Sequence, residues 1–286
     1  MTRTALVPSS LAREAEDKRE ATRKLGYVAR AAAVFRVDRL VVFPDSEGER
    51  RWGAGFVETV LRYAATPPYL RKEAWDVRDE LECVGVLPPL RVSPRTGSGS
   101  ERPGSLRQGI VTEVGPDGRV RVTCGLQHPI SLLVPPEMAV EEGERVAIRV
   151  SSREPVRARI VDEPLPGPSV RRMDLPEALS APDAGLRIAA SRHGTDLTVG
   201  RLADLPGPEG DLTVAFGAPD RGLPAILDVP PAAVGDDGID DDAAAGPDGG
   251  FDRWLNTVPD QGSEAVRTEE AMFASLGLLT LPRTQE

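Results

Sequence analysis

The residues best suited to bind a small molecule occur in two loops near the end of the chain. The first loop follows an apolar run at residues 212–216 and contains Gly217, Pro219 and Gly222. The second loop occupies residues 256–271, between another apolar run and a helical pattern. Glycine lets a ligand approach the backbone closely, and loops that follow parallel strands bind cofactors at the carboxyl edge of a sheet. Each loop alone could be an ordinary connection, but together they predict a cofactor crevice.

The few histidines and cysteines exclude most metal chemistry. His128 and His193 are the only histidines, and Cys83 and Cys124 are the only cysteines. This rules out zinc sites built from several imidazoles or thiolates, and a disulfide framework, so we expect no metal and two small core cysteines. His193 could form a triad with Ser191 and an aspartate, but a local Ser-Arg-His tripeptide favours a loop with no catalytic role. The usual hydrolase, P-loop, zinc-protease and dinucleotide motifs are absent.

The charge balance is acidic, and almost all of the basic residues are arginine. The chain has 286 residues, with 35 Lys plus Arg, 45 Asp plus Glu and a formal charge of −10. The only lysines are Lys18, Lys24 and Lys72, and the segment 235–250 is rich in aspartate. Excess carboxylates keep a surface hydrated in concentrated salt, which screens their repulsion. The composition therefore favours a halophilic protein over an acidic protein from a GC-rich genome. Because salt weakens phosphate attraction anyway, the acidity does not exclude RNA as a partner.

Length and hydropathy indicate a cytoplasmic protein of about two domains. No apolar run reaches the roughly 20 residues of a membrane span, and residues 1–10 lack the apolar core of a signal peptide. We therefore expect no membrane association.

Both ends of the chain alternate between strand and helix patterns. Apolar runs at residues 4–7 and 39–43 predict buried parallel strands, and residues 9–36 and 53–65 predict helices. This order is typical of a doubly wound α/β layer. The same alternation of strand and helix patterns returns after residue 169. Strands are expected there at residues 186–189, 211–216, 225–227 and 251–255. An acidic loop is expected at 235–250 and a last helix at 264–279.

The middle of the chain predicts a small β-barrel. A linker rich in Ser, Gly, Pro and Arg covers residues 93–105. Short alternating strand patterns follow at residues 108–114, 119–124, 130–134, 145–150 and 156–161. Short strands at this spacing are typical of an oligonucleotide-binding (OB) barrel. The expected fold class is therefore α/β with an inserted OB-like barrel, divided into residues 1–76, 77–163 and 164–286.

The second loop carries a motif of a known family. Residues 256–271 read Asn-Thr-Val-Pro-Asp-Gln-Gly-Ser-Glu-Ala-Val-Arg-Thr-Glu-Glu-Ala. They resemble the pattern N-x-x-P-x-Q-G-x-x-x-x-R-T-E-E-A of the SPOUT RNA methyltransferases, in the archaeal and eukaryotic branch linked to uridine-N3 methylation of large-subunit ribosomal RNA. Further similar segments occur in the same order at residues 29–43, 69–72, 107–111, 122–125 and 216–217.

This resemblance implies a fold and a cofactor. It implies a trefoil-knotted SPOUT methyltransferase domain that binds S-adenosylmethionine in the knot. The cofactor-binding residues that it implies are Ser191, His193, Gly194, Gly217, Ala218, Gly222, Leu223, Asn256, Thr257, Pro259, Gln261, Gly262, Arg267, Thr268 and Glu269. Two features depart from the family: His193 stands where the family carries a basic residue, and residues 235–250 form an insertion.

The resemblance also implies an RNA substrate and basic residues that contact it. Arg30 is the predicted catalytic residue, because a cation near the base oxygens would stabilise deprotonated uridine N3; a surface salt bridge is the alternative. The predicted RNA-binding residues are Arg36, Arg71, Lys72, Arg107 and Arg121. Since no Phe, Tyr or Trp occurs between Trp75 and Phe216, we expect the barrel to hold RNA through arginine and without aromatic stacking, or else to be a spacer.

The activity that these features favour is S-adenosylmethionine-dependent RNA methylation. Two alternatives stay open: a non-catalytic RNA-binding ribosome-assembly factor that keeps the fold, and a generic nucleotide-binding protein. A homodimer is also implied, and we expect it to use the last helix and the helix near Ser9. Phe273, Leu276 and Leu278 of the last helix exceed what one helix face needs for its own core.

Overall fold

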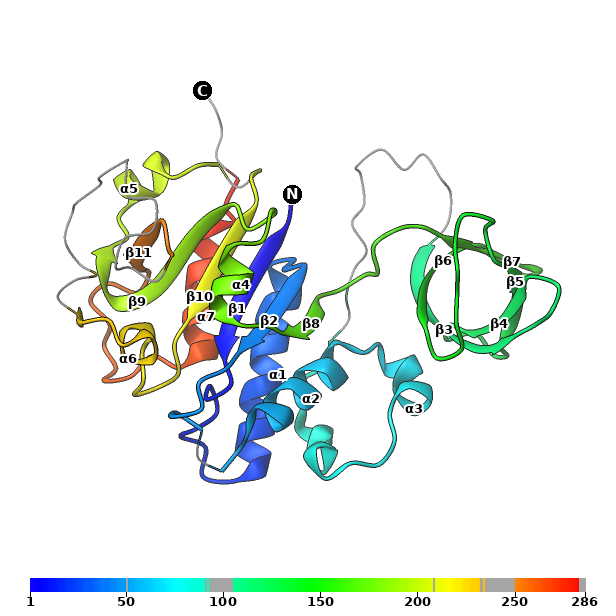
Figure 1. Ribbon diagram of the computed structural model, residues 1–286, viewed down its shortest axis with the longest axis horizontal. Coiled ribbons are helices and arrows are strands. Elements are labelled where there is room, and N and C mark those ends of the chain that lie inside the picture. The colour runs from blue at the N-terminus through cyan, green and yellow to red at the C-terminus, as the bar shows by residue number, and fades with distance from the viewer. Residues whose placement is uncertain are drawn as a thin grey trace. The chain divides into compact units, whose positions relative to one another are not determined.

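The structure is a computed structural model that describes residues 1–49, 51–90, 92, 105–207, 209–231, 234 and 250–282. The chain forms two compact units, one of residues 1–62, 80–88 and 168–286 and one of residues 63–79 and 89–167 (Figure 1). The predicted linker at 93–105 and the acidic loop at 235–250 lie outside the described residues, except for Ser105 and Gly250.

The first unit is built on a parallel sheet of six strands in the order β11-β9-β10-β1-β2-β8. The strands are β1 (Arg3–Pro8), β2 (Arg39–Phe43), β8 (Ser169–Arg172), β9 (Leu186–Asp196), β10 (Leu212–Phe216) and β11 (Arg253–Asn256). Every neighbouring pair is parallel, as in Leu6 with Val41 and Leu6 with Ala215. The predicted α/β class is therefore confirmed, and the carboxyl ends of all six strands lie at one edge.

Helices accompany the strands of this unit. They are α1 (Lys18–Val34), α2 (Ala54–Ala65), α4 (Leu175–Leu179), α5 (Val199–Asp204), α6 (Leu223–Leu227) and α7 (Thr268–Leu279), and α5 has no buried residue. Side chains alternate between faces along a strand, and Leu6 and Ala215 form one core with Leu179 of α4 and Leu223 of α6. The helices α1 and α7 pack side by side, and α7 also contacts β10 (Figure 1). Among the described residues, no helix is long and apolar enough to cross a membrane.

Several elements differ from the sequence-based expectation. The strand expected at 186–189 extends to Asp196 as β9. The helix expected at 9–36 begins only at Lys18, because Asp17 caps it by accepting a hydrogen bond from the Glu20 N–H at 2.7 Å. The segment expected as a strand at 225–227 belongs to α6, which has Pro224 in its first turn, where a missing N–H is harmless. The last helix begins at Thr268, where the Arg267 N–H donates to Glu270 at 2.9 Å.

The second unit contains an antiparallel sheet that nearly closes into a barrel. Its strands are β3 (Ser105–Val114), β4 (Arg119–Thr123), β5 (Ile130–Leu133), β6 (Arg145–Arg153) and β7 (Val156–Val161), in the order β5-β4-β3-β6-β7. The two edge strands β5 and β7 lie against each other, and the interior is filled by aliphatic side chains and by Cys124. The same unit holds α3 (Arg71–Ala74) and the short helical turn Pro68–Leu70. All five predicted strands are present; the turns Asp79–Leu81 and Val84–Val86 follow α3.

Candidate functional site

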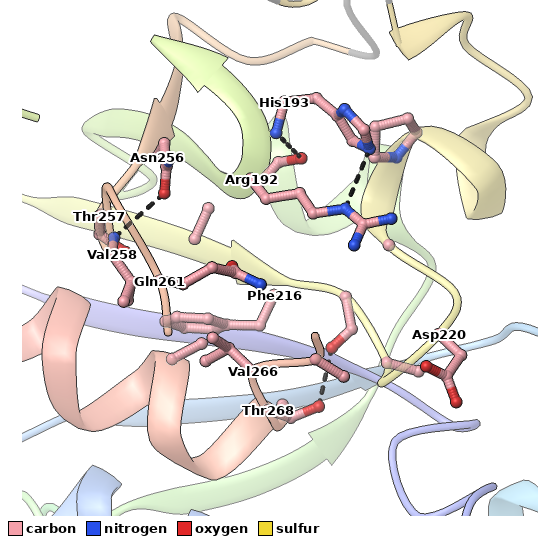
Figure 2. A pocket seen from close by; sticks show the side chains of 18 of the residues that line it. Arg192, His193, Phe216, Asp220, Asn256, Thr257, Val258, Gln261, Val266 and Thr268 are labelled. Atoms are coloured by element: carbon pink, nitrogen blue, oxygen red, sulfur yellow. Dashed lines mark hydrogen bonds between the residues drawn. The ribbon is translucent and has the colours of Figure 1, made fainter. Parts of the chain in front are cut away.

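A cavity of about 350 Å³ lies at the carboxyl edge of the parallel sheet (Figure 2). Three segments far apart in the sequence form it: the residues after Ala189 in β9, the loop between β10 and α6, and the loop between β11 and α7. Of the predicted cofactor-binding residues, those that line the cavity are Ser191, His193, Gly217, Ala218, Gly222, Asn256, Thr257, Gln261 and Thr268. The structure therefore brings the two loops identified in the sequence to one place.

A bulge in β9 brings the first segment to the cavity. Along β11, Trp254 pairs with Ala189 but the next residue, Leu255, pairs with Thr195, so residues 190–194 leave the ladder. Gly194 closes this bulge: a Cβ on it would lie 2.6 Å from the backbone N of Leu255. Gly194 does not line the cavity, but its lack of a side chain lets the bulge return to the sheet.

A tight turn shapes the second segment. Ala218 and Arg221 exchange backbone hydrogen bonds at 3.0 and 3.1 Å, and Asp220 adopts a left-handed φ of 60°, which Asp tolerates better than most residues. A Cβ on Gly217 would lie 2.8 Å from Gly222 Cα and 2.9 Å from the Leu223 N. Glycine is thus required at position 217 because the two ends of the turn touch there.

An ion pair that the sequence analysis missed anchors this turn. Arg221 Nε lies 3.1 Å from Asp45 Oδ1, and the Asp45 side chain is only 2% exposed. Asp45 also accepts a hydrogen bond from the Ser10 hydroxyl at 2.5 Å, and its N–H donates to Ser9 Oγ at 2.9 Å. Ser9, Ser10 and Asp45 follow directly after β1 and β2, so polar residues just beyond two parallel strands were the signal available in the sequence.

The polar residues of the C-terminal motif, residues 256–271, mostly hold the third segment in shape. The Asn256 amide donates to Asp196 at 2.9 Å, and its oxygen accepts the Val258 N–H at 3.2 Å. The Thr257 hydroxyl is 2.7 Å from that of Ser275. Thr268 Oγ1 donates to the Gly217 carbonyl at 2.8 Å and so ties the third segment to the second. The motif therefore builds the cavity wall before any ligand is bound.

The remaining predicted cofactor-binding residues do not line the cavity, and their contact with a cofactor stays a prediction. They are Gly194, Leu223, Pro259, Gly262, Arg267 and Glu269. Leu223 is fully buried in the core between the sheet and α6. Pro259, Gly262 and Arg267 are exposed, whereas Glu269 is 7% exposed. Burial raises the pKa of the Glu269 carboxyl, and its own backbone amide and Lys24 offset only part of that rise.

We expect Glu269→Gln to change how stability depends on pH. A raised pKa in the folded state means that the folded chain binds more protons than the unfolded chain above the ordinary value of 4.5. The contribution of protonated Glu269 is present below that pH and is lost as the pH rises through the folded-state pKa. Relative to the wild type, the Gln variant should therefore gain free energy of unfolding as the pH increases. Urea unfolding at a series of pH values tests this, and a constant difference between the two proteins would contradict it.

The cavity lining combines apolar side chains with polar and charged ones. Phe216, Val258 and Val266 contribute apolar surface, while Arg192 and His193 lie on the opposite side (Figure 2). Sequence reasoning missed Arg192, Asp220 and Glu264, which also line the cavity. Arg192 Nε donates to His193 Nε2 at 3.3 Å, and Ser191 Oγ accepts from the His193 backbone N–H at 3.2 Å. These contacts hold the bulge together and do not form a Ser-His pair for hydrolysis. The described residues include no cluster of His, Cys, Asp and Glu suited to a metal ion.

None of the predicted catalytic and RNA-binding residues is among the residues that line the cavity. Arg30 is exposed on α1, and Arg36 follows that helix with a left-handed φ of 54°. Arg71 lies over the Tyr63 ring at 4.6 Å and donates to the Thr66 carbonyl at 3.2 Å. Arg107 donates to the Cys124 carbonyl at 3.3 Å. Arg121 is exposed on β4, and Lys72 is exposed on α3. Their roles stay predictions, although Arg71 and Arg107 also have structural contacts.

The comparisons with known proteins agree on one protein family. A family model described as "Putative RNA methyltransferase" matches residues 2–279. An uncharacterized protein of Haloarcula marismortui is 69% identical over 284 residues, which cover 98% of this chain and 99% of that protein. An uncharacterized protein of Halobacterium salinarum is 68% identical over 283 residues, covering 98% and 99%. The human 28S rRNA (uridine-N(3))-methyltransferase is 30% identical over 315 residues, covering 97% of this chain and 77% of the human protein. Because the family match extends over nearly the whole chain, the protein belongs to this family of RNA methyltransferases.

Proposed function

We propose that the protein transfers a methyl group from S-adenosylmethionine to N3 of a uridine in large-subunit ribosomal RNA. The observation that carries this proposal is the cavity, which the C-terminal motif lines together with the β9 bulge and the β10–α6 turn. The names of the similar human and mouse proteins, 28S rRNA (uridine-N(3))-methyltransferases, support a ribosomal uridine as the substrate.

The cavity lining suits S-adenosylmethionine in size and in charge. Its volume of about 350 Å³ lies in the range of small-molecule sites. Apolar side chains such as Phe216 and Val266 suit the adenine ring. The carboxylates of Asp220 and Glu264 suit the positively charged sulfonium and amino groups, and Arg192 suits the carboxylate. When bound, this cofactor supplies a methyl group on positively charged sulfur, ready for transfer to a nucleophile.

The contribution of the chain itself is alignment, exclusion of water and stabilisation of charge. The backbone turns at residues 190–194 and 217–222 shape the cavity and hold its walls without a ligand. Uridine N3 must lose its proton, and the base oxygens then gain negative charge that a nearby cation stabilises. Since Arg192 of the cavity lining is assigned to the cofactor carboxylate, Arg30 remains the predicted catalytic residue for this role.

We also propose a SPOUT-type knot in the first unit and a homodimer. The dimer surface expected on the last helix needs revision, because Leu276 is 1% exposed and so belongs to the core of one chain. Phe273 packs against Phe35, which directly follows α1, with ring centroids 6.0 Å apart. The large hydrophobic side chains still exposed on these elements and just beyond them are Tyr27, Val34 and Leu281, at 43%, 51% and 48%. We propose that a second copy covers these three side chains.

Four further proposals concern the fold and its setting. The order β5-β4-β3-β6-β7, with β5 against β7, supports an OB-like barrel. We propose that residues 77–163 are a barrel inserted between the two halves of the SPOUT domain, residues 1–76 and 164–286. The acidic, lysine-poor composition supports adaptation to concentrated salt. A cytoplasmic location follows from action on ribosomal RNA.

Calorimetry and a methyl-transfer assay test the proposed function. In concentrated salt, the full chain should bind S-adenosylmethionine and S-adenosylhomocysteine saturably and with one site per chain. With radiolabelled donor and unmodified large-subunit ribosomal RNA, label should appear in 3-methyluridine after nuclease digestion. A chain that binds the RNA but neither cofactor would contradict the proposal and favour the non-catalytic assembly factor.

A further inference from the structure

The barrel unit receives aromatic side chains from outside its strands. Residues 63–79 belong to the same compact unit as the barrel, and they contain Tyr63, Tyr69 and Trp75. Although no Phe, Tyr or Trp occurs between Trp75 and Phe216, this unit therefore still has aromatic rings on which a nucleic-acid base could stack. A base can stack only on a ring that contacts within the unit leave open.

Two of these rings are occupied by contacts within the unit. Tyr63 and Trp75 pack edge to face with centroids 5.8 Å apart. Arg71 covers the Tyr63 ring at 4.6 Å, and Trp75 Nε1 donates to the Thr66 hydroxyl at 3.0 Å. Both rings are half-buried. Their packing fixes the helical segment, and Tyr69 is the ring that remains for a ligand.

Tyr69 is held in place by contacts within the unit and is still the most exposed of the three aromatic residues. A Cβ on Gly125 would lie 2.7 Å from Tyr69 Cγ, so the glycine allows the backbone after β4 to lie against the ring. The Tyr69 hydroxyl donates to the Gln108 carbonyl at 3.2 Å. The residue nevertheless remains 39% exposed. Because the ring is already oriented, stacking a base on it costs little side-chain entropy.

Positive charge lies beside this ring. The Arg107 guanidinium is 6.0 Å from the Tyr69 ring centroid, and its hydrogen bond to the Cys124 carbonyl fixes it there. Lys72 is exposed on α3, three residues after Tyr69. An exposed aromatic ring with cations near it is the arrangement that proteins use for single-stranded nucleic acids, where bases stack and phosphates pair with charge. It is unsuited to a duplex, whose bases are already stacked.

We propose that Tyr69 stacks an unpaired base of the substrate RNA while Arg107 and Lys72 contact the adjoining phosphates. This inference rests on the proposed function and adds to it, since it assigns to the barrel unit a single-stranded site with a named stacking residue. It also changes the expectation that the barrel holds RNA through arginine alone.

Fluorescence anisotropy with a labelled oligouridylate of about 12 nucleotides tests the inference in the full chain. Tyr69→Leu should weaken binding about tenfold and leave the slope of log K against log salt unchanged, because no charge is lost. Tyr69→Phe, which keeps the ring and loses the hydrogen bond to Gln108, should bind within about twofold of the wild type. Arg107→Gln should weaken binding and lower the salt slope by about one.

Matched controls separate stacking from a general loss of structure. Leu133→Ser removes another exposed apolar side chain of the same unit, 59% exposed on β5, and should bind the oligouridylate as the wild type does. An abasic strand of equal length should bind the wild type and Tyr69→Leu equally. The inference is overturned if Tyr69→Leu binds oligouridylate like the wild type, or if it loses both strands alike.

The two proposals can fail separately. Stacking through Tyr69 in a chain that transfers no methyl group would support this inference and refute the proposed function. Methyl transfer by a chain whose RNA affinity does not depend on Tyr69 would support the proposed function and refute this inference.

Discussion

A Gly217→Ala substitution should weaken the binding of S-adenosylmethionine by about tenfold or more. The added Cβ would lie 2.8 Å from Gly222 Cα and 2.9 Å from the Leu223 N. Both are backbone atoms, so the turn that forms one wall of the cavity must shift to make room. Overpacking of this kind costs about 1–3 kcal/mol, and 1.4 kcal/mol corresponds to a factor of ten in affinity. Calorimetric titration of the folded variant provides the measurement.

The control is a glycine of the same unit whose added Cβ meets almost nothing. On Gly200 in α5, the nearest atom would be 3.9 Å away. Gly200→Ala should therefore leave cofactor affinity unchanged within about twofold. Equal affinity in the wild type and a well-folded Gly217→Ala protein would show that this turn does not shape the cofactor site. The position of Cβ also implies that a larger residue such as Leu would first displace the turn, before it could fill the cavity.

An Asp45→Asn substitution should lower both the free energy of unfolding and the affinity for the cofactor. The change keeps the shape of the side chain but removes the charge that pairs with Arg221 at 3.1 Å. Breaking a buried pair by neutralising one partner costs about 3 kcal/mol, because Arg221 is then left in a partly buried position. Among the described residues, Arg221 then keeps only Glu47, at 3.2 Å and 84% exposed, as an ionic partner in the loop after β2. The β10–α6 turn is held less firmly, and a loss of about 1.4 kcal/mol in cofactor binding would lower the affinity about tenfold. Urea unfolding and calorimetry measure the two effects.

Asp183→Asn is the matched control for this pair. Asp183 pairs with Arg39 at 2.6 Å, at the start of β2 and therefore at the opposite edge of the sheet from the cavity. Its side chain is 37% exposed, so its loss should cost less stability than the loss of Asp45. Cofactor affinity should not change. If Asp45→Asn reduced stability without affecting cofactor binding, the ion pair would be a fold contact that has no part in the site.

Much of the fold could be predicted because strands and turns depend on neighbouring residues. The run Arg39–Phe43 is apolar on both faces, as a buried parallel strand requires, and the structure places β2 at these same residues. The alternating runs of the barrel gave all five strands for the same reason. Prediction failed where local signals competed: Leu223–Leu227 is apolar enough for a strand, but Pro224 and the following turn make it a helix.

The roles of individual motif residues could not be predicted, because they depend on contacts between distant segments. The motif placed Asn256, Thr257 and Thr268 at the cavity, yet the structure shows them bonded to Asp196, Ser275 and Gly217. Glu269 belongs to the same motif and points instead into a buried, partly charged environment near Lys24. A motif indicates which loop forms a site, whereas packing decides which of its side chains face the ligand.

The sequence by itself determined the alternation of strand and helix, the barrel strands and the two loops that form the cavity. Each of these follows from the periodicity or turn preference of a short segment. Only the tertiary structure decided that Arg192 lines the cavity, that Arg221 reaches Asp45 across 176 residues, and that Tyr69 lies against Gly125 of the barrel unit. These contacts exist because parallel strands align their carboxyl ends and because packing brings distant segments within hydrogen-bonding reach, which no local pattern encodes.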